Sequence, residues 1–429
     1  MQRTLAGQLA QVAPGETVKV EGWIHRRRAL AAVTFVVIRD RSGLAQVVVK
    51  DPHTVEQVAG LGEETVVEVT GTVMENPSAP GGFELVDPTF ELLSEPAHTP
   101  PVELWRPSMS AGLPTLLDNA PVTLRHPRSK ASWLLASASM QGFRRSLTGE
   151  GFTEIQTPKI VGTSTESGAN VFTVDYFGQQ AYLAQSPQLY KQTLVGVFER
   201  VFEVGPVFRA EPHDTVRHIA EYVSLDAELG FIEDHRDVLA VLRTAIDGML
   251  TTIMELAPAA VDLLEVQLPT VPEQIPVIHF ADALKLVGAP EDEPDLAPAH
   301  ERALSAWAMA ENGSEFLAVE GYPMRKRPFY THPQPDDPRW SNSFDLLFRG
   351  LELTTGGQRL HRYTDYQAAL AATGQSEEPY VGYLQAFKHG MPPHGGFAIG
   401  LERWVARLTG AENIRSARLF PRDLNRLMP

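Results

Sequence analysis

The sequence predicts two domains, a small β-barrel followed by a larger domain that mixes helices and strands. Five short strand-like segments separated by turn residues fill residues 17–92, and a Pro-rich stretch with few periodic apolar positions follows. Helical periodicity begins only after Ser129. We therefore predict a barrel domain at residues 1–95, a linker or hinge at 96–127 and an α+β domain at 128–429.

The composition is that of a globular protein with a substantial core. Hydrophobic residues make up 43% of the 429 residues and charged residues 21%, and there is no cysteine to form disulfides or thiolate metal sites. No apolar run approaches the ~20 residues that cross a bilayer, and the first residues lack an apolar signal core, so we expect a cytoplasmic protein with no membrane partner. The net charge of −16 argues against a general nucleic-acid coat but leaves room for a local basic patch, such as Arg26–Arg28.

Each expected barrel strand has one apolar face, and a five-stranded barrel of this size is most often an oligonucleotide-binding fold. The expected strands are Val18–His25, Val33–Arg39, Leu44–Lys50, Thr65–Val73 and Phe83–Leu92. In the larger domain a long helix with one buried stripe is expected first. The stripe consists of Trp133, Leu134, Met140, Phe143 and Leu147.

The stretch Gly205–Phe231 reads as two strands that flank a polar loop. Side chains alternate along a strand, so Arg209 and Glu211 share one face, as do Tyr222, Ser224, Asp226 and Glu228 on the second strand. Cations for phosphates, a ring for a base and carboxylates for polar or metal contacts would suit a nucleotide. The alternative is a surface hairpin with incidental ion pairs.

Two further polar segments precede this hairpin. Gly162–Ala169 is a small-residue loop with one carboxylate, Glu166, and is either a surface loop or a lid over a substrate. At Gln185–Gln192 a strand is expected to end at Ser186, with Pro187 as the first helical residue. Ser186, Gln188 and Lys191 would then cluster at a helix N-terminus, as an anion site or as solvated side chains.

Near the C-terminus, Gly350–Arg359 brings a strand carboxylate, Glu352, to a glycine turn and then to Arg359. Pro392–Arg403 runs from a glycine-rich strand into a helix with Arg403 on its first turn.

Together and in this order, these segments resemble the three signature motifs of class II aminoacyl-tRNA synthetases. Gly151–Ile160 is similar to motif 1, Phe208–Glu211 with the following loop to motif 2, and Gly396–Arg403 to motif 3. The resemblance covers essentially the whole chain and is strongest to aspartyl-tRNA synthetases of the compact archaeal and eukaryotic type. It implies a mainly antiparallel catalytic sheet flanked by helices, an anticodon-binding barrel, and a homodimer formed through motif 1.

The resemblance also implies the reaction and the roles of the residues. ATP and aspartate would form aspartyl-adenylate, and the aspartyl group would then pass to tRNA. Arg209 would grip the α-phosphate, Arg403, Arg217 and His218 the γ-phosphate end, Tyr222 the adenine ring and Glu211 its amino group. Glu352 and Thr355 would hold Mg²⁺ through oxygen ligands. Arg209, Arg403 and Glu352 are the implied catalytic residues.

For aspartate, the resemblance implies that Arg359 and Lys191 hold the side-chain carboxylate while Asp226 orients Lys191. Glu166, Ser186 and Gln188 would address the α-ammonium group. In the barrel, Phe35, Gln46 and Glu84 match positions that contact anticodon bases, and Arg26 and Arg28 would contact phosphates. A barrel-core phenylalanine and a solvated basic turn are the respective alternatives.

His25 and Pro77 match the pattern of compact enzymes that charge both tRNA(Asp) and tRNA(Asn). A non-discriminating enzyme would supply Asp-tRNA(Asn) to a tRNA-dependent amidotransferase. Three alternatives stay open: a ligase for tRNA(Asp) alone, an asparagine-activating paralogue, and a non-catalytic RNA-binding relative. The presence of Arg209, Arg403 and Glu352 disfavours the last.

Overall fold

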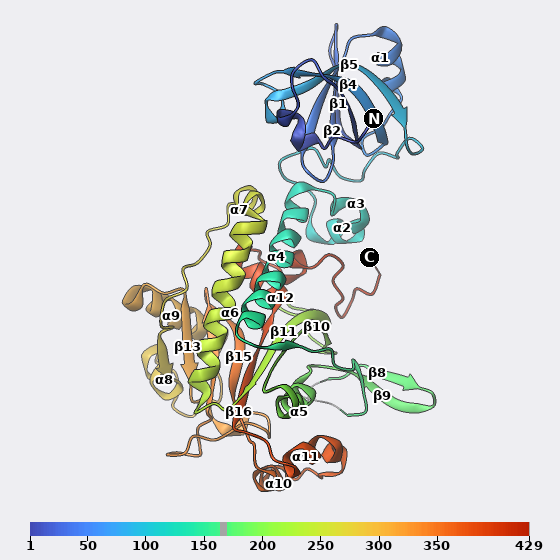
Figure 1. The fold of residues 1–429 in the computed structure, drawn as a ribbon. Coiled ribbons are helices and arrows are strands. Elements are labelled where there is room, and N and C mark those ends of the chain that lie inside the picture. The colour runs from blue at the N-terminus through green and yellow to red at the C-terminus, as the bar shows by residue number, and fades with distance from the viewer. Residues whose placement is uncertain (164–169, 429) are drawn as a thin grey trace. The chain divides into compact units, whose positions relative to one another are not determined.

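The computed structural model describes residues 1–163 and 170–428, which form two compact units, Met1–His126 and Pro127–Pro429 (Figure 1). No helix within these described ranges is both long and apolar enough to span a membrane. Glu166, the carboxylate of the expected lid, lies outside them.

The first unit is built on a closed five-stranded barrel with the strand order β1-β2-β3-β5-β4, so the predicted barrel is confirmed. Its strands are β1 (Thr17–Ala29), β2 (Thr34–Arg39), β3 (Leu44–Val49), β4 (Val66–Glu75) and β5 (Phe83–Leu92). The alternating valines and isoleucines fill the barrel, as Val36 and Ile38 of β2 do. Helix α1 (Pro52–Ala59), capped by Asp51, was not predicted.

The segment predicted as a linker is more structured than its proline content suggested. It contains two short helices, α2 (Leu113–Asp118) and α3 (Ala120–Thr123). Each has proline in its first turn, where the missing N–H costs no hydrogen bond, so these prolines start helices instead of marking an irregular chain.

The second unit is organised around an eight-stranded sheet with the order β12-β13-β14-β15-β16-β11-β10-β6. The strands are β6 (Thr153–Glu154), β10 (Arg200–Phe208), β11 (Glu221–Gly230), β12 (Val277–His279), β13 (Phe316–Glu320), β14 (Ser343–Phe348), β15 (Leu351–Arg359) and β16 (His394–Gly400). The central pairs are antiparallel, and only the two end pairs, β12 with β13 and β6 with β10, are parallel. The mainly antiparallel sheet is confirmed.

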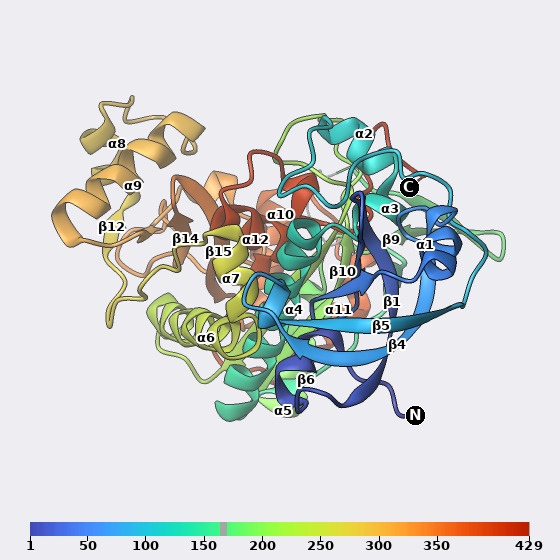
Figure 2. The same cartoon turned by 90° about the horizontal axis from the view of Figure 1, so that it is seen from above.

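Helices cover the core face of this sheet. The helices of the unit are α4 (Pro127–Gly149), α5 (Gln188–Phe198), α6 (His235–Leu256), α7 (Pro258–Leu264), α8 (Phe280–Val287), α9 (Pro298–Asn312), α10 (Tyr363–Ala372), α11 (Val381–Lys388) and α12 (Leu401–Thr409). Side chains of α4, α6 and α12 pack with Leu225, Ala227 and Leu229 of β11 in one core. Helices α8 and α9 lie at the β12 end (Figure 2).

The predicted helical stripe is partly wrong. Phe143 and Leu147 of α4 are fully buried, and Trp133 and Met140 pack at the edge of the core, but Leu134 is 43% exposed. The motif 1 segment Gly151–Ile160 contains the two-residue strand β6. A small antiparallel sheet begins at its end and consists of β7 (Ile160–Val161), β9 (Gln179–Leu183) and β8 (Thr173–Tyr176).

Candidate active site

The predicted hairpin is formed by β10 and β11, which pair antiparallel from Arg200 with Leu229 to Phe208 with Glu221. The alternation along β11 also holds: Leu225 and Ala227 face the core, which places Tyr222, Ser224, Asp226 and Glu228 on the opposite face. Strand β10 ends at Phe208, so Arg209 and Glu211 belong to the loop and not, as predicted, to the strand.

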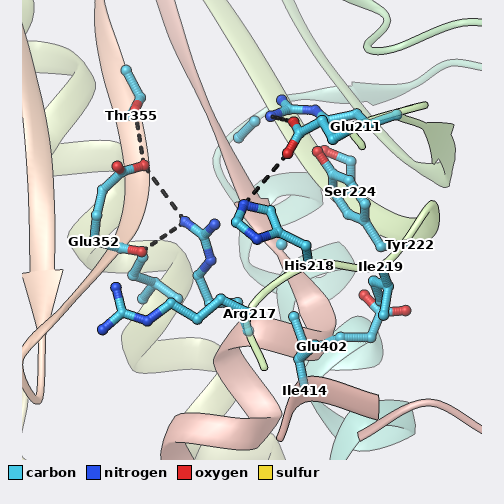
Figure 3. Close-up of a pocket in the computed structure, with 15 residues that line it drawn as sticks. Glu211, Arg217, His218, Ile219, Tyr222, Ser224, Glu352, Thr355, Glu402 and Ile414 are labelled. Atoms are coloured by element: carbon cyan, nitrogen blue, oxygen red, sulfur yellow. Dashed lines mark hydrogen bonds and ion pairs between the residues drawn. The ribbon is translucent and has the colours of Figure 1, made fainter. Parts of the chain in front are cut away.

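A cavity of about 290 Å³ opens on this face of the sheet (Figure 3). It is lined by residues from the hairpin, β15, β16, α12 and the C-terminal segment. All of the residues expected to contact ATP are among them: Arg209, Glu211, Arg217, His218, Tyr222, Glu352 and Arg403. The fold thus gathers on one surface side chains as far apart in the sequence as Arg209 and Arg403.

Glu352 and Arg403 form one wall of the cavity. Arg403 Nη1 donates to the Glu352 carbonyl oxygen at 2.8 Å and lies 3.5 Å from its Oε1, while Thr355 Oγ1 donates to the same Oε1 at 3.3 Å. Arg403 is on the first turn of α12, as predicted. Arg217 Nη1 lies 3.9 Å from Oε2 of Glu301, a carboxylate of α9 whose pKa is raised by burial.

The opposite wall carries the ring and the remaining charges. Arg209 Cζ lies 5.6 Å from the centroid of the Tyr222 ring, and Arg209 Nη1 lies 3.8 Å from Glu211 Oε1. His218 Nε2 lies 3.4 Å from Glu211 Oε2. Burial lowers the pKa of His218 despite this neighbouring carboxylate, so the imidazole is neutral at pH 7. The positive charges of the two walls are therefore those of three arginines, Arg209, Arg217 and Arg403.

Asp345 is a buried carboxylate near Glu352 that the sequence analysis missed. On β14 it faces Thr355 of β15 in register, and Arg327 Nη2 donates to its Oδ1 at 3.0 Å. Burial raises the pKa of Asp345 to about 6, with Glu352 adding to the effect and Arg327 opposing it. A lone carboxylate in the apolar run Phe344–Phe348 was the available signal.

Glu352 and Thr355 therefore offer hard oxygen atoms at one edge of the cavity, and buried Asp345 pairs in register with Thr355; oxygen is the ligand type that Mg²⁺ takes. Among the residues that the structure describes, no group of three or more His, Asp or Glu side chains is arranged to hold a metal alone.

Asp226 and Glu228, the remaining residues on this face of β11, belong to a buried ionic cluster next to the cavity. Lys191 Nζ lies 3.0 Å from Asp226 Oδ1 and 3.2 Å from Glu228 Oε2. Arg359 Nε donates to Glu228 Oε1 at 3.1 Å, and its Nη2 donates to the Gly396 carbonyl at 3.0 Å. These four side chains are at most 8% exposed. Burial raises the pKa of Glu228, but Arg359 and Lys191 outweigh this and lower it.

Glycines make room for this cluster. A Cβ atom on Gly396 would lie 2.0 Å from Glu228 Oε2, and one on Gly356 would lie 2.5 Å from the ring of Phe344. Gly356 and Gly357 are strand residues of β15, so the predicted glycine turn is wrong. The glycines permit close packing of strands instead of a reversal of the chain.

The remaining residues of the predicted amino-acid site lie next to the cluster. Lys191 is in the first turn of α5. Gln188, the first residue of this helix, is buried. Ser186 Oγ accepts from the Gln188 backbone N–H at 3.3 Å. The helix begins at Gln188, directly after the predicted Pro187, whereas β9 ends at Leu183, before the predicted Ser186.

In the barrel unit, the expected anticodon residues lie on one outer face. Arg28 pairs in register with Phe35, Arg26 and Gln46 both pair with Val37, and Gln46 pairs with Glu84. Phe35 is half-buried and lies outside the barrel core, with Arg28 Cζ 5.4 Å from its ring centroid. Gln46 Nε2 donates to Glu84 Oε2 at 2.8 Å. The surface therefore presents an exposed cation, a ring and polar groups side by side.

His25 differs from these residues because it is buried. Its Nδ1 lies 3.1 Å from Arg39 Nη1, and burial with the charge of Arg39 lowers its pKa to about 4. Pro77 is exposed in the β4–β5 loop. Arg26 Cζ lies 3.9 Å from the ring centroid of Trp105.

Residues 113–424 match the family described as tRNA synthetases class II (D, K and N), and residues 18–93 match the OB-fold nucleic acid binding domain. The chain belongs to the class II tRNA synthetases. The predicted fold class and enzyme class are thereby confirmed.

Similar synthetases include proteins with different named substrates. The Aspartate--tRNA(Asp/Asn) ligase of Deinococcus radiodurans is 45% identical over 100% of this chain and 99% of its own length. The Aspartate--tRNA(Asp) ligase of Pyrococcus furiosus is 36% identical over 99% of both chains. The asparaginyl-tRNA synthetase of Pyrococcus horikoshii, solved with asparaginyl-adenylate, has a TM-score of 0.90 at 30% identity over 97% of both chains.

Proposed function

We propose that the protein ligates L-aspartate to tRNA with ATP, through aspartyl-adenylate, and that it charges both tRNA(Asp) and tRNA(Asn). The observation that carries the proposal is the continuity of the cavity with the buried cluster of Lys191 and Arg359. Tyr222 and Ser224 of β11 line the cavity, and Asp226 and Glu228 follow on the same face. Alternate residues are about 7 Å apart along a strand, which is the scale of an amino acid placed beside a nucleotide.

In the proposed first step, an α-carboxylate oxygen of aspartate attacks the α-phosphorus of ATP. A C–O–P linkage forms, the bond to the bridging oxygen breaks, and pyrophosphate leaves with the electron pair. This displacement needs alignment and charge neutralisation more than proton transfer. We assign Arg209 to the α-phosphate and Arg403, Arg217 and His218 to the γ-phosphate end, because all four border the cavity.

The adenosine and the metal are assigned to the two walls. Tyr222 supports the adenine ring and Glu211 accepts from its amino group. Glu352 and Thr355, with Asp345 in register with Thr355, would hold Mg²⁺, which supplies counter-charge to the phosphates when bound.

For the amino acid, we assign the β-carboxylate to Lys191 and Arg359, whose directions are fixed by Asp226 and Glu228. We assign Ser186 and Gln188 to the α-ammonium group, as the sequence predicts, and Glu166, expected to join them, lies outside the described residues. In the second step a hydroxyl of the terminal adenosine of tRNA attacks the aspartyl carbonyl, and AMP leaves.

The barrel unit bears on which tRNAs the enzyme charges. The outer barrel face with Phe35, Arg28, Gln46 and Glu84 supports stacking and edge contacts with splayed anticodon bases. Because His25 is buried, we assign it an indirect role through Arg39, while Pro77 is exposed and able to touch RNA. Asp-tRNA(Asn) cannot serve translation directly, so its formation would require an amidotransferase. We propose that the enzyme acts in the cytoplasm, where its tRNA substrates would be used.

We also propose a homodimer. Residues Pro158–Gly162 with β8 and β9 line a surface groove of about 530 Å³, and Ile160 and Tyr176 beside it are 47% and 48% exposed. Exposed apolar side chains around a groove are typical of an interface. Sedimentation velocity at micromolar concentration tests this proposal, and a monomer throughout would contradict it.

Two assays test the activity. In ATP–pyrophosphate exchange we expect aspartate to support the reaction and asparagine to fail; the reverse result would identify the asparagine-activating alternative. In aminoacylation we expect [³H]aspartate on purified transcripts of both tRNAs. Charging of tRNA(Asp) alone would leave the ligase in place and refute the wider tRNA range.

A further inference from the structure

The loop that carries Arg217 and His218 is held by the C-terminal end of the chain. The loop spans residues 209–220, between β10 and β11. The Ile414 backbone N–H donates to the Val216 carbonyl at 2.9 Å, and the Ala220 N–H donates to the Arg422 carbonyl at 2.6 Å. The tip and the base of the loop are thus each bound to a segment some 200 positions away in sequence.

Arg415 is the centre of this attachment. Its guanidinium is 9% exposed; Nη2 lies 2.7 Å from Asp214 Oδ1, and Nη1 donates to the Thr215 carbonyl at 3.1 Å. Nε donates to Asp423 Oδ2 at 2.5 Å. Asn425 Nδ2 donates to the second Asp214 oxygen at 2.8 Å. Both carboxylate oxygens of Asp214 therefore receive a donor from the C-terminal segment.

The attachment reaches the cavity through Thr215. Thr215 Oγ1 accepts from the Arg217 backbone N–H at 3.2 Å and lies 2.7 Å from His218 Nδ1. Fixing Thr215 thus fixes the start of the turn from which Arg217 and His218 enter the cavity (Figure 3). Ile414, the residue before Arg415, itself lines the cavity.

The arrangement of Arg415 and Asp214 is not the one expected of an ion pair that only stabilises the fold. Asp214 is 50% exposed, and an exposed loop gains little stability from one surface carboxylate. A nearly buried guanidinium with partners on the loop and on the tail instead restricts the loop before a ligand arrives. Ordering a flexible loop when a ligand binds costs free energy and weakens binding. A loop that is already ordered avoids this cost and binds its ligand more tightly.

We propose that Arg415 is a positioning residue that pre-orders the 209–220 loop for the triphosphate end of ATP, acting through Asp214 and Thr215. The inference rests on the proposed ATP-dependent function and adds to it a role for the C-terminal segment. Arg415 contacts no substrate in this scheme; it sets where Arg217 and His218 stand.

Asp214→Ala is the test variant, because its position is half-exposed and the substitution removes the loop's carboxylate without emptying the core. In aspartate-dependent ATP–pyrophosphate exchange, we expect KM for ATP to rise about two- to fivefold, as for loss of one partly exposed charge pair. KM for aspartate and the melting temperature should stay unchanged, because the Lys191–Arg359 cluster lies on other elements. A role confined to folding would lower the melting temperature and leave KM for ATP as it was.

Three further variants test whether the contact between Arg415 and Asp214 is responsible for the change in KM for ATP. Asp214→Asn keeps an acceptor for Arg415 and should recover part of the ATP affinity. Arg415→Lys keeps the charge but cannot reach Asp214, Asp423 and the Thr215 carbonyl together, so it should also raise KM for ATP. Asp282→Ala, which removes an exposed ion pair with Lys285 on α8, is the matched control and should behave as wild type.

Hydrogen exchange separates this inference from the proposed function. Amides of residues 213–218 should exchange faster in Asp214→Ala and Arg415→Lys than in wild type and in the control, with or without activity. If the wild-type protein catalyses no ATP–pyrophosphate exchange with aspartate, the proposed function alone would be refuted. Unchanged KM for ATP in an active enzyme, or unchanged loop protection in both variants, would overturn the role of Arg415.

Discussion

Arg359→Lys is the substitution that most directly probes the amino-acid site. Arg359 is 7% exposed and directs two nitrogen atoms at the protein, Nε at Glu228 and Nη2 at the Gly396 carbonyl. A lysine ammonium is a single point at the end of a flexible chain. It cannot keep both of these contacts and also meet a substrate carboxylate in a fixed direction.

The magnitude follows from the contacts. Loss of a charged hydrogen bond in a buried site costs about 1.5–3 kcal/mol, which corresponds to a fall of about 10- to 150-fold in kcat/KM for aspartate. KM for ATP should change less than about twofold, because the residues that line the cavity are untouched.

The assay is ATP–pyrophosphate exchange with aspartate varied at saturating ATP, and then ATP varied at saturating aspartate. Arg349→Lys is the matched control, because Arg349 also contacts a carboxylate and two carbonyls but lies away from the cavity. Aspartate kinetics within about threefold of wild type in Arg359→Lys, where a lost charged hydrogen bond should cost far more, would remove Arg359 from its assigned role.

Three other predictions address stability, metal and RNA. Burial raises the pKa of Glu320, but hydrogen bonds from His235 and Arg236 outweigh it and bring the pKa down from 4.5 to about 2. Glu320→Gln should therefore cost about 2 kcal/mol in urea unfolding at pH 7, and the difference should shrink as the pH falls from 4.5 towards 2, where the wild-type carboxylate takes up a proton; a pH-independent difference would contradict this. Glu352→Gln should raise the Mg²⁺ concentration for half-maximal exchange about tenfold or more, since one carboxylate charge is lost, and an unshifted Mg²⁺ titration would exclude Glu352 as a ligand. Phe35→Ala should raise KM for tRNA about five- to tenfold and leave pyrophosphate exchange unchanged, as expected for one lost stacking contact; an unchanged KM for tRNA would argue against stacking on Phe35.

Much of the site was predictable because its side chains follow local alternation. Tyr222, Ser224 and Asp226 share a face of β11 whatever the rest of the fold does. The same alternation included Glu228, but nothing local indicates that a carboxylate will be fully buried between two cations. That burial depends on β15, β16 and α5, whose contacts join residues up to 206 positions apart.

Two of the incorrect predictions, the glycine turn and the position of Leu134, have a shared cause. Gly356 and Gly357 predicted a turn because glycine permits many backbone conformations, whereas here their missing side chains let β14 pack closely. Leu134 fitted the apolar stripe of α4 but faces outward. In both cases the deciding fact was the neighbour across the sheet or the helix, which a local pattern does not contain.

The charges of the cluster bear on how asparagine is rejected. Lys191 and Arg359 are balanced by Asp226 and Glu228, so the four side chains sum to zero before any substrate enters. Preference for an anionic side chain must then come from the direction of the donors and not from an excess of positive charge. Glu228→Gln separates the two explanations, because it leaves a net charge of +1 and also releases Arg359 Nε from its ionic partner. If direction decides, the ratio of kcat/KM for aspartate to that for asparagine should fall; if net charge decides, it should rise. The ratio is independent of how much of the variant folds, so a rise would refute the role of Glu228 in aiming Arg359.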